Sequence, residues 1–400
     1  MAKTAAEILA LLCQNSVEVI DKGELEARLA ASLKEKKPLR VKAGFDPSAP
    51  DIHLGHTVLL RKLRQFQDLG HKVIFIIGDY TAMVGDPTGQ SKTRPLLSKE
   101  QIEDNAKTYQ DQAFKILDKN PEKIEIVRNS QWLDGPDMFR ILFQKIAAMV
   151  NIDQLLERED FDKRRRAHRP IVVRELLYPM LQGYDSVMVK ADIELGGTDQ
   201  KFNLLMGRDL QYQFAQKPQI VITMPLLVGL DGTIKMSKSL GNYVAVTDSP
   251  RDMFGKIMSL PDALMPLYFS LLTSEWDEAT GSGVRSDPRS AKVKLAKNIV
   301  VQYYGEKIAD KEAAEFDRVF RDKQSPESPE EIKLSSKTLW IVELLKEVHS
   351  AKTGQEARRL IEHGAVELDG IKIKDPKAEV SISSGSLLKV GKKKYFKLIV

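Results

Sequence analysis

The chain has 400 residues, of which 42% are hydrophobic and 29% are charged, and its formal net charge is +5. This length exceeds one ordinary hydrophobic core, so we expect two or three domains. No segment approaches the ~18 consecutive apolar residues of a membrane-spanning helix, which argues against a membrane protein. The single cysteine, Cys13, can form neither an internal disulfide nor a zinc cluster, so we expect a cytoplasmic protein with a buried thiol.

The first elements along the chain form a β-α-β unit. The opening segment carries an acidic residue inside its apolar stretch, which predicts an amphipathic helix rather than a signal peptide. Residues 39–45 predict a strand, and residues 53–69 have apolar side chains at helical spacing. Residues 73–77 are wholly apolar, which is typical of a parallel strand covered on both faces.

Further strands are expected at residues 124–127, 187–189 and 220–226, with long helical stretches between them. The alternation predicts a Rossmann-like α/β domain over residues 1–235. The sequence contains neither G-x-G-x-x-G nor G-x-x-x-x-G-K-[ST], which excludes the dinucleotide fingerprint and the P-loop as its phosphate-binding device.

Residues 236–330 begin with a loop and continue with helix-forming sequence, which predicts a second, helical domain. The polar, proline-bearing stretch 321–331 has too little apolar content to pack, so we expect a linker there.

The C-terminal segment, residues 338–400, predicts a small α+β domain. Two short helices are expected at 338–346 and 353–363, and Asp369-Gly370 is typical of a tight turn between strands. The segment holds 12 Lys and Arg against 8 Asp and Glu. This positive excess indicates either a polyanion-binding surface or merely a solubilising one.

Two short motifs carry most of the functional information. His53 and His56 share the first turn of a predicted helix, where free backbone amides already favour anions. Lys235 and Lys238 flank Ser237 in a loop that follows a Gly-Leu-Asp-Gly turn, and the glycines permit lid motion. Each motif alone is more typical of an exposed helix end or a solvated loop. Together they predict a phosphate clamp with the two histidines and two lysines as catalytic groups.

The two motifs, in this order, resemble the HIGH and KMSKS motifs of class I aminoacyl-tRNA synthetases. The resemblance implies ATP as a substrate, with Mg²⁺ held through the phosphates rather than by protein metal ligands. It places Gly55 where adenine approaches the backbone and gives Ser48 a hydroxyl for a phosphate oxygen. It also places Asp199 against the ribose, with Ser237 and Lys238 at the phosphates.

A polar stripe on one predicted helix marks the second half of the site. Tyr178, Gln182 and Asp185 stand at i, i+4 and i+7, so they share one face of the helix. Such a stripe is either a structural network or a ligand site. The stretch resembles the tyrosine-binding helix of tyrosyl-tRNA synthetases. The resemblance implies that Tyr178 and Gln182 hold the substrate ammonium group and that Asp185 holds the phenolic hydroxyl.

Three further residues complete the amino-acid site by the same resemblance. Asp86 also receives the ammonium group, and Gln200 faces the substrate carboxylate. Lys42 departs from the pattern, because many members of the family have tyrosine at that position. Lys42 either pairs with Asp185 or bonds the phenol oxygen itself. The departure leaves tyrosine favoured over tryptophan but removes one supporting residue.

About the last 60 residues resemble an S-four-like RNA-binding module. Arg358 and Arg359 on its second helix, with the turn Lys392, Lys393 and Lys394, are the expected RNA contacts. A second basic cluster, residues 163–166, either receives the acceptor end of tRNA or is a solvated helix face.

The whole chain therefore resembles the bacterial, KMSKS-bearing tyrosyl-tRNA synthetases: a Rossmann-like catalytic domain, a helical domain on the anticodon side and the RNA-binding module. The resemblance implies activation of L-tyrosine by ATP, transfer to the 3′ end of tRNA(Tyr), and a homodimer. Two alternatives stay open, namely a tryptophanyl enzyme and an RNA-binding relative that has lost catalysis.

Overall fold

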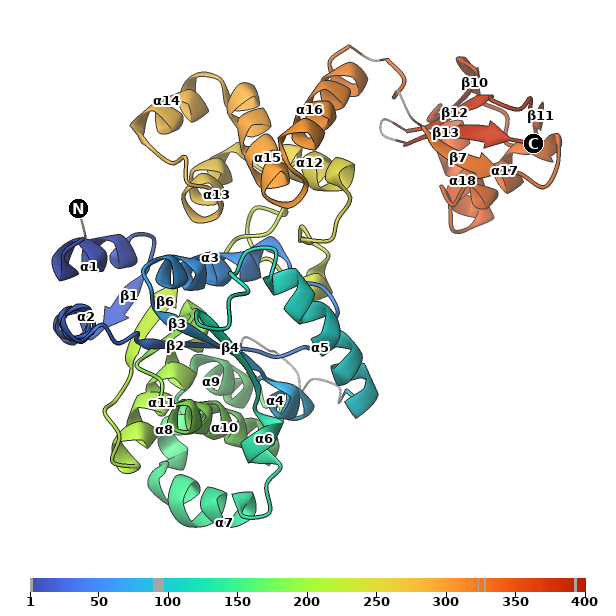
Figure 1. Ribbon diagram of the computed structural model, residues 1–400. Coiled ribbons are helices and arrows are strands. Elements are labelled where there is room, and N and C mark those ends of the chain that lie inside the picture. Colours follow the sequence, from blue (N-terminus) through green and yellow to red (C-terminus); the bar gives the residue numbers. More distant parts are fainter. Residues whose placement is uncertain (1–2, 89–96, 323, 327–328, 392–393) are drawn as a thin grey trace. The chain divides into compact units, whose positions relative to one another are not determined.

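The computed structural model describes residues 3–88, 97–322, 324–326, 329–391 and 394–400, and Figure 1 shows its elements. The chain divides into two compact units, Met1–Ala309 and Asp310–Val400. The first contains a six-stranded sheet, and the second contains a five-stranded and a two-stranded sheet.

The strands of the first unit are β1 (Glu18–Ile20), β2 (Arg40–Phe45), β3 (Lys72–Ile77), β4 (Ile124–Arg128), β5 (Ile193–Gly197) and β6 (Ile220–Met224). Its α-helices are α1 (Ala5–Cys13), α2 (Lys22–Glu35), α3 (Leu54–Asp68), α4 (Asp79–Val84), α5 (Lys99–Ala113), α6 (Ser130–Leu133), α7 (Met138–Ile141), α8 (Ile152–Leu156), α9 (Glu159–Arg166), α10 (Val173–Val189), α11 (Lys201–Gln213), α12 (Pro250–Met258), α13 (Met265–Leu272), α14 (Glu278–Ser286) and α15 (Pro288–Tyr304). Short turns of other helical types are η1 (Leu142–Ile146), η2 (Ala147–Met149), η3 (Thr198–Gln200), η4 (Lys238–Leu240) and η5 (Asp262–Leu264).

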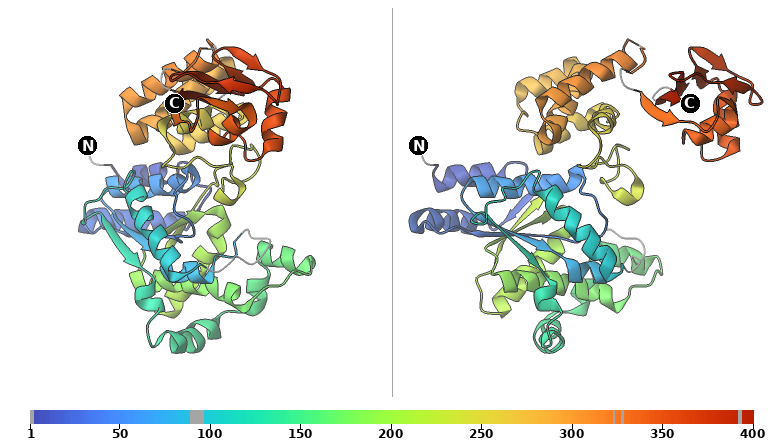
Figure 2. Two further views of the ribbon diagram at one scale, coloured as in Figure 1. Left: turned by 90° about the vertical axis from the view of Figure 1, so that its right-hand side faces the viewer. Right: turned by 45° about the vertical axis from the view of Figure 1, so that its right-hand side comes forward.

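The sheet of the first unit has the order β1-β6-β5-β2-β3-β4, and every neighbouring pair except the antiparallel β1 and β6 is parallel. Helix α3 crosses one face, whereas α10 and α11 cover the other (Figures 1 and 2). Because both faces are covered, β6 is buried at every position. The Rossmann-like α/β prediction is confirmed.

Four of the predicted strands form, but the strand expected at 187–189 is wrong. Those residues end helix α10, where Val187 and Val189 are buried in hydrophobic clusters. The helix stops at Lys190, which adopts a left-handed conformation with φ 49°. The strand of this region is β5, which follows directly, so a β-branched run was assigned to the wrong element.

The N-terminal helix is confirmed as α1, and Cys13 is its last residue. The thiol is half-buried rather than fully buried. Strand β1 was not expected, because three residues at a sheet edge leave almost no periodic signal in the sequence.

The second unit contains most of α16 (Glu306–Phe320), which begins in the first unit, and then β7 (Glu330–Lys333), β8 (Thr338–Trp340), α17 (Ile341–Glu347), α18 (Gly354–Glu362), β9 (Val366–Leu368), β10 (Ile371–Ile373), β11 (Glu379–Ser381), β12 (Leu387–Val390) and β13 (Lys394–Ile399). Strand β7 pairs in parallel with β13, so the last residues of the predicted linker belong to the sheet. The first residues of the helix expected at 338–346 form β8 instead. The tight turn is confirmed, with positive φ at Asp369 and Gly370 between β9 and β10.

Candidate active site

The candidate site lies at the carboxyl ends of the central parallel strands, where ligands bind in open α/β sheets. Strand β2 leads into the segment that precedes His53, β3 leads into α4, and β5 leads into η3. The motif-bearing residues therefore reach one edge of the sheet from segments that are distant in sequence.

The two phosphate motifs are joined by a short backbone ladder. The Leu54 amide donates to the Val244 carbonyl at 3.0 Å, and the Val246 amide donates to the Ile52 carbonyl at 2.9 Å. His53 and Ala245 pair between these bonds as an isolated antiparallel bridge. The lysine loop thus returns beside the helix that begins with the histidines.

His53 is the N-cap of α3, and its ring lies 3.9 Å from the His56 ring, measured between centroids. His56 Nδ1 accepts a hydrogen bond from the His53 amide at 3.3 Å, so the neutral His56 ring carries its proton on Nε2. Burial, together with the nearby lysines, lowers the pKa of His56 to about 3 and that of His53 even further. Both imidazoles are therefore uncharged at neutral pH.

Gly55 leaves room for the His53 ring. A Cβ added at Gly55 would lie 3.0 Å from His53 Nδ1 and 3.6 Å from Met236 Cβ. The first distance is tighter than an ordinary van der Waals contact, so a side chain there would press on the imidazole. The adenine role predicted for Gly55 and the phosphate role of Ser48, which is exposed, stay predictions.

Both lysines of the loop contact the predicted site. Lys235 Nζ lies 2.8 Å from Asp199 Oδ2, which joins the loop to the predicted ribose-binding residue. Lys238 Nζ donates to the Ala49 carbonyl at 3.2 Å, in the segment between β2 and His53. Burial lowers the pKa of Lys238 to about 8. The hydroxyls of Ser237 and Ser239 lie 2.9 Å apart.

Asn242 stabilises the base of the lysine loop through hydrogen bonds. Its Oδ1 accepts from the Ser237 amide at 2.8 Å, and its Nδ2 donates to the Lys235 carbonyl at 3.2 Å and to the Asp231 carboxylate. The other Asp231 oxygen accepts from the Ile234 amide at 2.8 Å. These hydrogen bonds lower the pKa of Asp231 to about 2, so the anchor keeps its charge at neutral pH.

The polar stripe predicted on one helix is present on α10. Tyr178 is buried, and its hydroxyl donates to Asp46 Oδ2 at 2.8 Å. The other Asp46 oxygen accepts from Thr81 Oγ1 at 2.7 Å. Burial and the nearby carboxylates hold the pKa of Tyr178 well above its ordinary value, so this hydroxyl is a donor at neutral pH.

Asp185 is buried at the far end of the stripe. Trp132 Nε1 donates to its Oδ1 at 2.8 Å, and Asn129 Nδ2 donates to its Oδ2 at 3.3 Å. Burial raises the pKa of Asp185 to about 7, against the opposing influence of Lys42 and of these two donors. A carboxylate fixed in this way presents acceptor capacity to a phenolic O–H.

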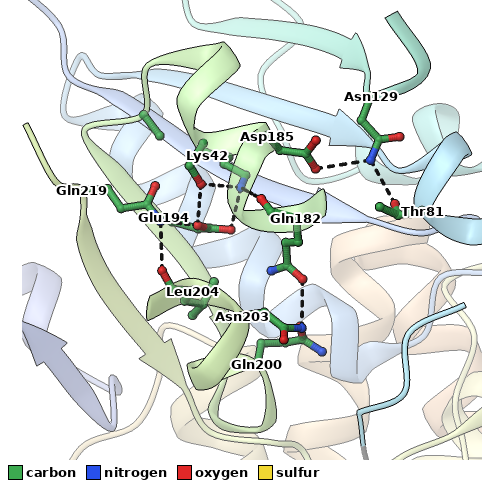
Figure 3. Close-up of polar contacts among 12 residues, drawn as sticks. Lys42, Thr81, Asn129, Gln182, Asp185, Glu194, Gln200, Asn203, Leu204 and Gln219 are labelled. Atoms are coloured by element: carbon green, nitrogen blue, oxygen red, sulfur yellow. Dashed lines mark hydrogen bonds and ion pairs between the residues drawn. The ribbon is translucent and has the colours of Figure 1, made fainter. Parts of the chain in front are cut away.

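A chain of side-chain amides connects the remaining predicted residues. Asn203 Nδ2 donates to Gln182 Oε1 at 3.0 Å and to Gln200 Oε1 at 2.9 Å. Gln200 Nε2 donates to Asp86 Oδ2 at 2.8 Å (Figure 3 shows the Gln182, Asn203 and Gln200 side chains). The structure thus brings Gln182 and Asp86, two of the predicted ammonium-binding residues, into one network with Gln200.

Lys42 differs from its prediction. The ammonium group pairs with Glu194 Oε1 at 2.9 Å, and both side chains are fully buried. Of the two alternatives for Lys42, the pairing with Asp185 is therefore wrong, and the contact with the phenol oxygen stays a prediction. Glu194 was missed because it stands on β5, a strand that the sequence did not indicate.

Other residues that bond to the predicted site residues were also not predicted from the sequence: Asp46, Asn129, Trp132, Asn203 and Asn242. Only Asp46 had a signal, since it lies in the Phe-Asp-Pro-Ser segment before His53. The others are joined to the site by side-chain contacts between different elements, which no local pattern reveals.

The basic cluster at 163–166 is divided in the structure. Arg164 forms a buried ion pair with Glu175 at 2.8 Å, whereas Arg165 and Arg166 are exposed and pair with Asp162. Lys163 lines a cavity of about 550 Å³ that also borders Asp199. The tRNA role of the cluster stays a prediction.

In the second unit, Arg358 and Arg359 are exposed on α18, and the Arg358 guanidinium lies 5.6 Å from the Trp340 ring centroid. Lys394 is exposed at the start of β13, whereas Lys392 and Lys393 lie outside the described residues.

Neither a metal-binding cluster nor a membrane-spanning helix is present among the described residues. In the described ranges, no three or more His, Cys, Asp or Glu side chains are grouped so as to hold a metal ion. Over the same residues, no helix has the length and apolarity needed to cross a membrane.

Comparison with known proteins identifies the family. The model of the family described as "tRNA synthetases class I (W and Y)" matches residues 34–321, and that of the S4 domain matches residues 339–384. The chain is 48% identical over 398 residues to the tyrosine–tRNA ligase of Aquifex aeolicus, covering 99% of both chains. The chain belongs to the tyrosyl-tRNA synthetases.

Two further comparisons agree. The tyrosine–tRNA ligase of Carboxydothermus hydrogenoformans is 49% identical over 404 residues, covering 98% of this chain and 97% of that one. The crystal structure of the Archaeoglobus fulgidus tyrosyl-tRNA synthetase with L-tyrosine shares the fold, with a TM-score of 0.63, 23% identity and coverage of 78% and 100%. The tyrosyl prediction is confirmed over the tryptophanyl alternative, and so is the aminoacyl-tRNA synthetase class.

Proposed function

We propose that this synthetase activates L-tyrosine with ATP at the edge of its parallel sheet and then transfers the tyrosyl group to tRNA(Tyr). The observation that carries the proposal is the backbone ladder between residues 52–54 and 244–246, which holds the histidine and lysine motifs together. Beside them lies the buried polar stripe of α10, which supplies the amino-acid half of the site.

In the first step, the tyrosine carboxylate attacks the α-phosphorus of ATP and pyrophosphate leaves, so negative charge grows on the leaving group. His53 and His56 act as neutral donors to the phosphates, since burial keeps their pKa values far below 7. Lys238 supplies positive charge, and Mg²⁺ enters on the ATP phosphates.

The ion pair between Lys235 and Asp199 supports a role for both residues in loop closure. In the structure, the Lys235 ammonium group lies 2.8 Å from the Asp199 carboxylate. When ATP binds, the ribose hydroxyls take Asp199 and the phosphates take Lys235. Lys235 therefore exchanges the Asp199 carboxylate for the ATP phosphates. Because both partners are anionic, the free-energy cost of moving the loop is small.

For the amino acid, the Tyr178 hydroxyl, Gln182 and Asp86 surround the ammonium group, and Gln200 faces the carboxylate. Asp185 accepts the hydrogen bond of the phenolic hydroxyl. Its fixed geometry supports discrimination, because phenylalanine cannot donate the further hydrogen bond that this buried carboxylate accepts beside those from Trp132 and Asn129.

For the RNA, we assign the S4 domain as the tRNA contact, through Arg358, Arg359 and Lys394. Their exposure and the positive excess of residues 338–400 support this assignment. We also propose that the protein acts in the cytoplasm.

We further propose a homodimer. Phe139 and Phe143 are 74% and 54% exposed, and their rings lie 4.7 Å apart on one surface of the first unit. Large exposed aromatic side chains of this kind mark protein interfaces. A molar mass of one subunit from light scattering at micromolar concentration would contradict the dimer.

Charging of unfractionated tRNA tests the complete reaction. We expect labelled tyrosine to be attached to one tRNA species, through a bond that alkaline treatment cleaves. If adenylate forms but no tRNA accepts tyrosine, the transfer step of the proposal fails.

A further inference from the structure

A fully buried ion pair lies next to the amino-acid site, between β2, β5 and α10. Lys42 of β2 and Glu194 of β5 are register partners in neighbouring parallel strands. The Lys42 side chain is 0% exposed and the Glu194 side chain 1% exposed, and Nζ lies 2.9 Å from Oε1 (Figure 3). Desolvating two charges is costly, so the pair calls for an explanation beyond stability.

All three N–H donors of the Lys42 ammonium group are occupied. They point to Glu194 Oε1 at 2.9 Å, to the Gln182 carbonyl at 3.0 Å and to Ser186 Oγ at 2.7 Å. An ammonium group has three donors and no acceptor. Lys42 therefore has no hydrogen bond left to offer a phenol oxygen while these contacts persist.

The partners of Lys42 on α10 bracket the hydroxyl-binding residue. Gln182 and Ser186 are four residues apart, so the ammonium group bonds one turn of the helix, and Asp185 lies in that turn. The pair thereby ties this turn to strands β2 and β5 at the centre of the sheet.

Glu194 is held on its other side. Its Oε2 accepts from Ser186 Oγ at 3.0 Å and from Gln219 Nε2, and Gln219 also donates to the Leu204 carbonyl at 3.2 Å. A Cβ at Gly207 of α11 would lie 2.5 Å from Gln219 Nε2, so α11 passes close over the cluster. These hydrogen bonds and the close approach of α11 restrict rotation of the side chains in the cluster. They also leave no space for a ligand.

We propose that Lys42 and Glu194 are a positioning pair for tyrosine recognition: they fix the α10 turn that aims Gln182 and Asp185 at the substrate, and Asp185 alone reads the hydroxyl. This inference rests on the proposed role of Asp185. It makes Glu194 a determinant of specificity, although Glu194 does not touch the substrate.

A double-mutant cycle tests the proposal with Lys42→Met, Glu194→Gln and the double variant. Each single variant leaves one buried charge unpaired, and we expect it to raise the KM for tyrosine about 10- to 100-fold by misplacing the turn. The single-turnover adenylation rate at saturating tyrosine should change much less. In the double variant no charge is unpaired, so the melting temperature should recover, but the ammonium group that ties the turn is still absent, so the KM for tyrosine should stay within about threefold of that of Lys42→Met. Recovery of the KM in the double variant would show that only the unpaired charge matters, and would overturn the proposal.

Glu175→Gln is the matched control, because it breaks the buried Arg164–Glu175 pair in the first turn of the same helix. It should lower the melting temperature without raising the KM for tyrosine. An equal rise in KM would reduce the Lys42 effect to a general loss of stability and overturn the proposal.

Two other results would also overturn it. If Lys42→Met loses discrimination whereas Glu194→Gln keeps it, then Lys42 contacts the phenol oxygen directly and Glu194 positions nothing. If Lys42→Met changes neither KM nor discrimination, the pair positions nothing. If the proposed function itself is wrong, the unaltered protein will show no tyrosine-dependent activity. That result differs from each of the outcomes that overturn only the positioning role.

Discussion

At the residue scale, the proposed mechanism assigns different parts of the charge stabilisation to the histidines and to the lysines. His53 and His56 are uncharged at neutral pH, since burial lowers both pKa values. They contribute directed N–H groups, whereas Lys238 contributes charge. Because the pKa of Lys238 is about 8, most of that charge is present at pH 7 even before the phosphates bind.

Replacing Lys238 with alanine should therefore slow adenylate formation far more than it weakens tyrosine binding. The charge acts on the leaving pyrophosphate, so the loss should reach roughly 2 to 4 kcal/mol of transition-state stabilisation. Single-turnover adenylate formation and equilibrium binding of tyrosine measure the two quantities. An unchanged rate would remove Lys238 from the mechanism.

Asp185 should make tyrosine recognition depend on pH. Its pKa is raised to about 7, so its ionised form prevails only above that pH. A charged acceptor bonds the phenol more strongly than a neutral one. The kcat/KM ratio of tyrosine to phenylalanine should thus fall as the pH drops from 8 to 6, and Asp185→Asn should show a small ratio without this dependence.

The same raised pKa has a consequence for stability. A buried carboxyl group with a raised pKa stabilises the fold below the unfolded-state value of 3.8, and this contribution is lost as the pH rises through 7. The melting temperature of Asp185→Asn relative to the unaltered protein should therefore increase between pH 5 and pH 8. A difference in melting temperature that stays constant over this range would mean that Asp185 is ionised throughout, and would contradict the raised pKa.

Residues in linear motifs could be found from the sequence, because their chemistry and spacing stand together in one segment. The histidines, the loop lysines and the stripe on α10 are examples. Glu194, Asn129 and Trp132 could not be found in this way. Each acts on a residue from another element, so its importance exists only after the chain has folded.

At the element scale, the base of the lysine loop is fixed by hydrogen bonds, and in the proposed mechanism the loop closes over ATP. Asn242 joins both sides of that base through the Ser237 amide, the Lys235 carbonyl and Asp231. Asn242→Ala would leave these groups without their partner. We expect an adenylation rate about 5- to 100-fold lower, equivalent to the roughly 1 to 3 kcal/mol of an unsatisfied polar group, with tyrosine binding unchanged.

Thr233→Val is a suitable control in the same loop. Its exposed hydroxyl lies 3.2 Å from Asp231 Oδ1, but the Thr233 amide also bonds that oxygen. The variant should keep nearly full activity. If Asn242→Ala were equally active, the loop would not depend on this anchor.

Residues 187–189 were predicted to be a strand but form the end of helix α10. Valine favours strands intrinsically, but here the apolar face of α10 extends one further turn into the core. The parallel strands β2 and β3 were predictable because their apolar runs were flanked by clear helix and turn signals.

At the scale of the whole molecule, the chain consists of a catalytic unit and a smaller unit with its own hydrophobic core. Such a core supports independent folding of each part. The family match of the catalytic part ends at residue 321, before β7 pairs with β13.

A chain that ends after Arg321 should keep tyrosine adenylation and lose efficient transfer to tRNA. A cut near Lys337 would instead leave β7 without its partner strand, so the earlier end is the better test. Aminoacylation by the full chain should also weaken more steeply with salt than that of the shortened chain, since cationic contacts to phosphates are lost. Equal charging by both proteins across a salt series would show that the S4 domain does not bind tRNA.

The central claim is that this site activates tyrosine, and exchange of labelled pyrophosphate into ATP tests it most directly. The exchange is measured with each of the twenty amino acids in turn, using the full-length protein and Mg²⁺. We predict rapid exchange with tyrosine, very slow exchange with phenylalanine and none above background with tryptophan. Exchange with tryptophan that matched tyrosine, or no exchange with any amino acid, would contradict the account.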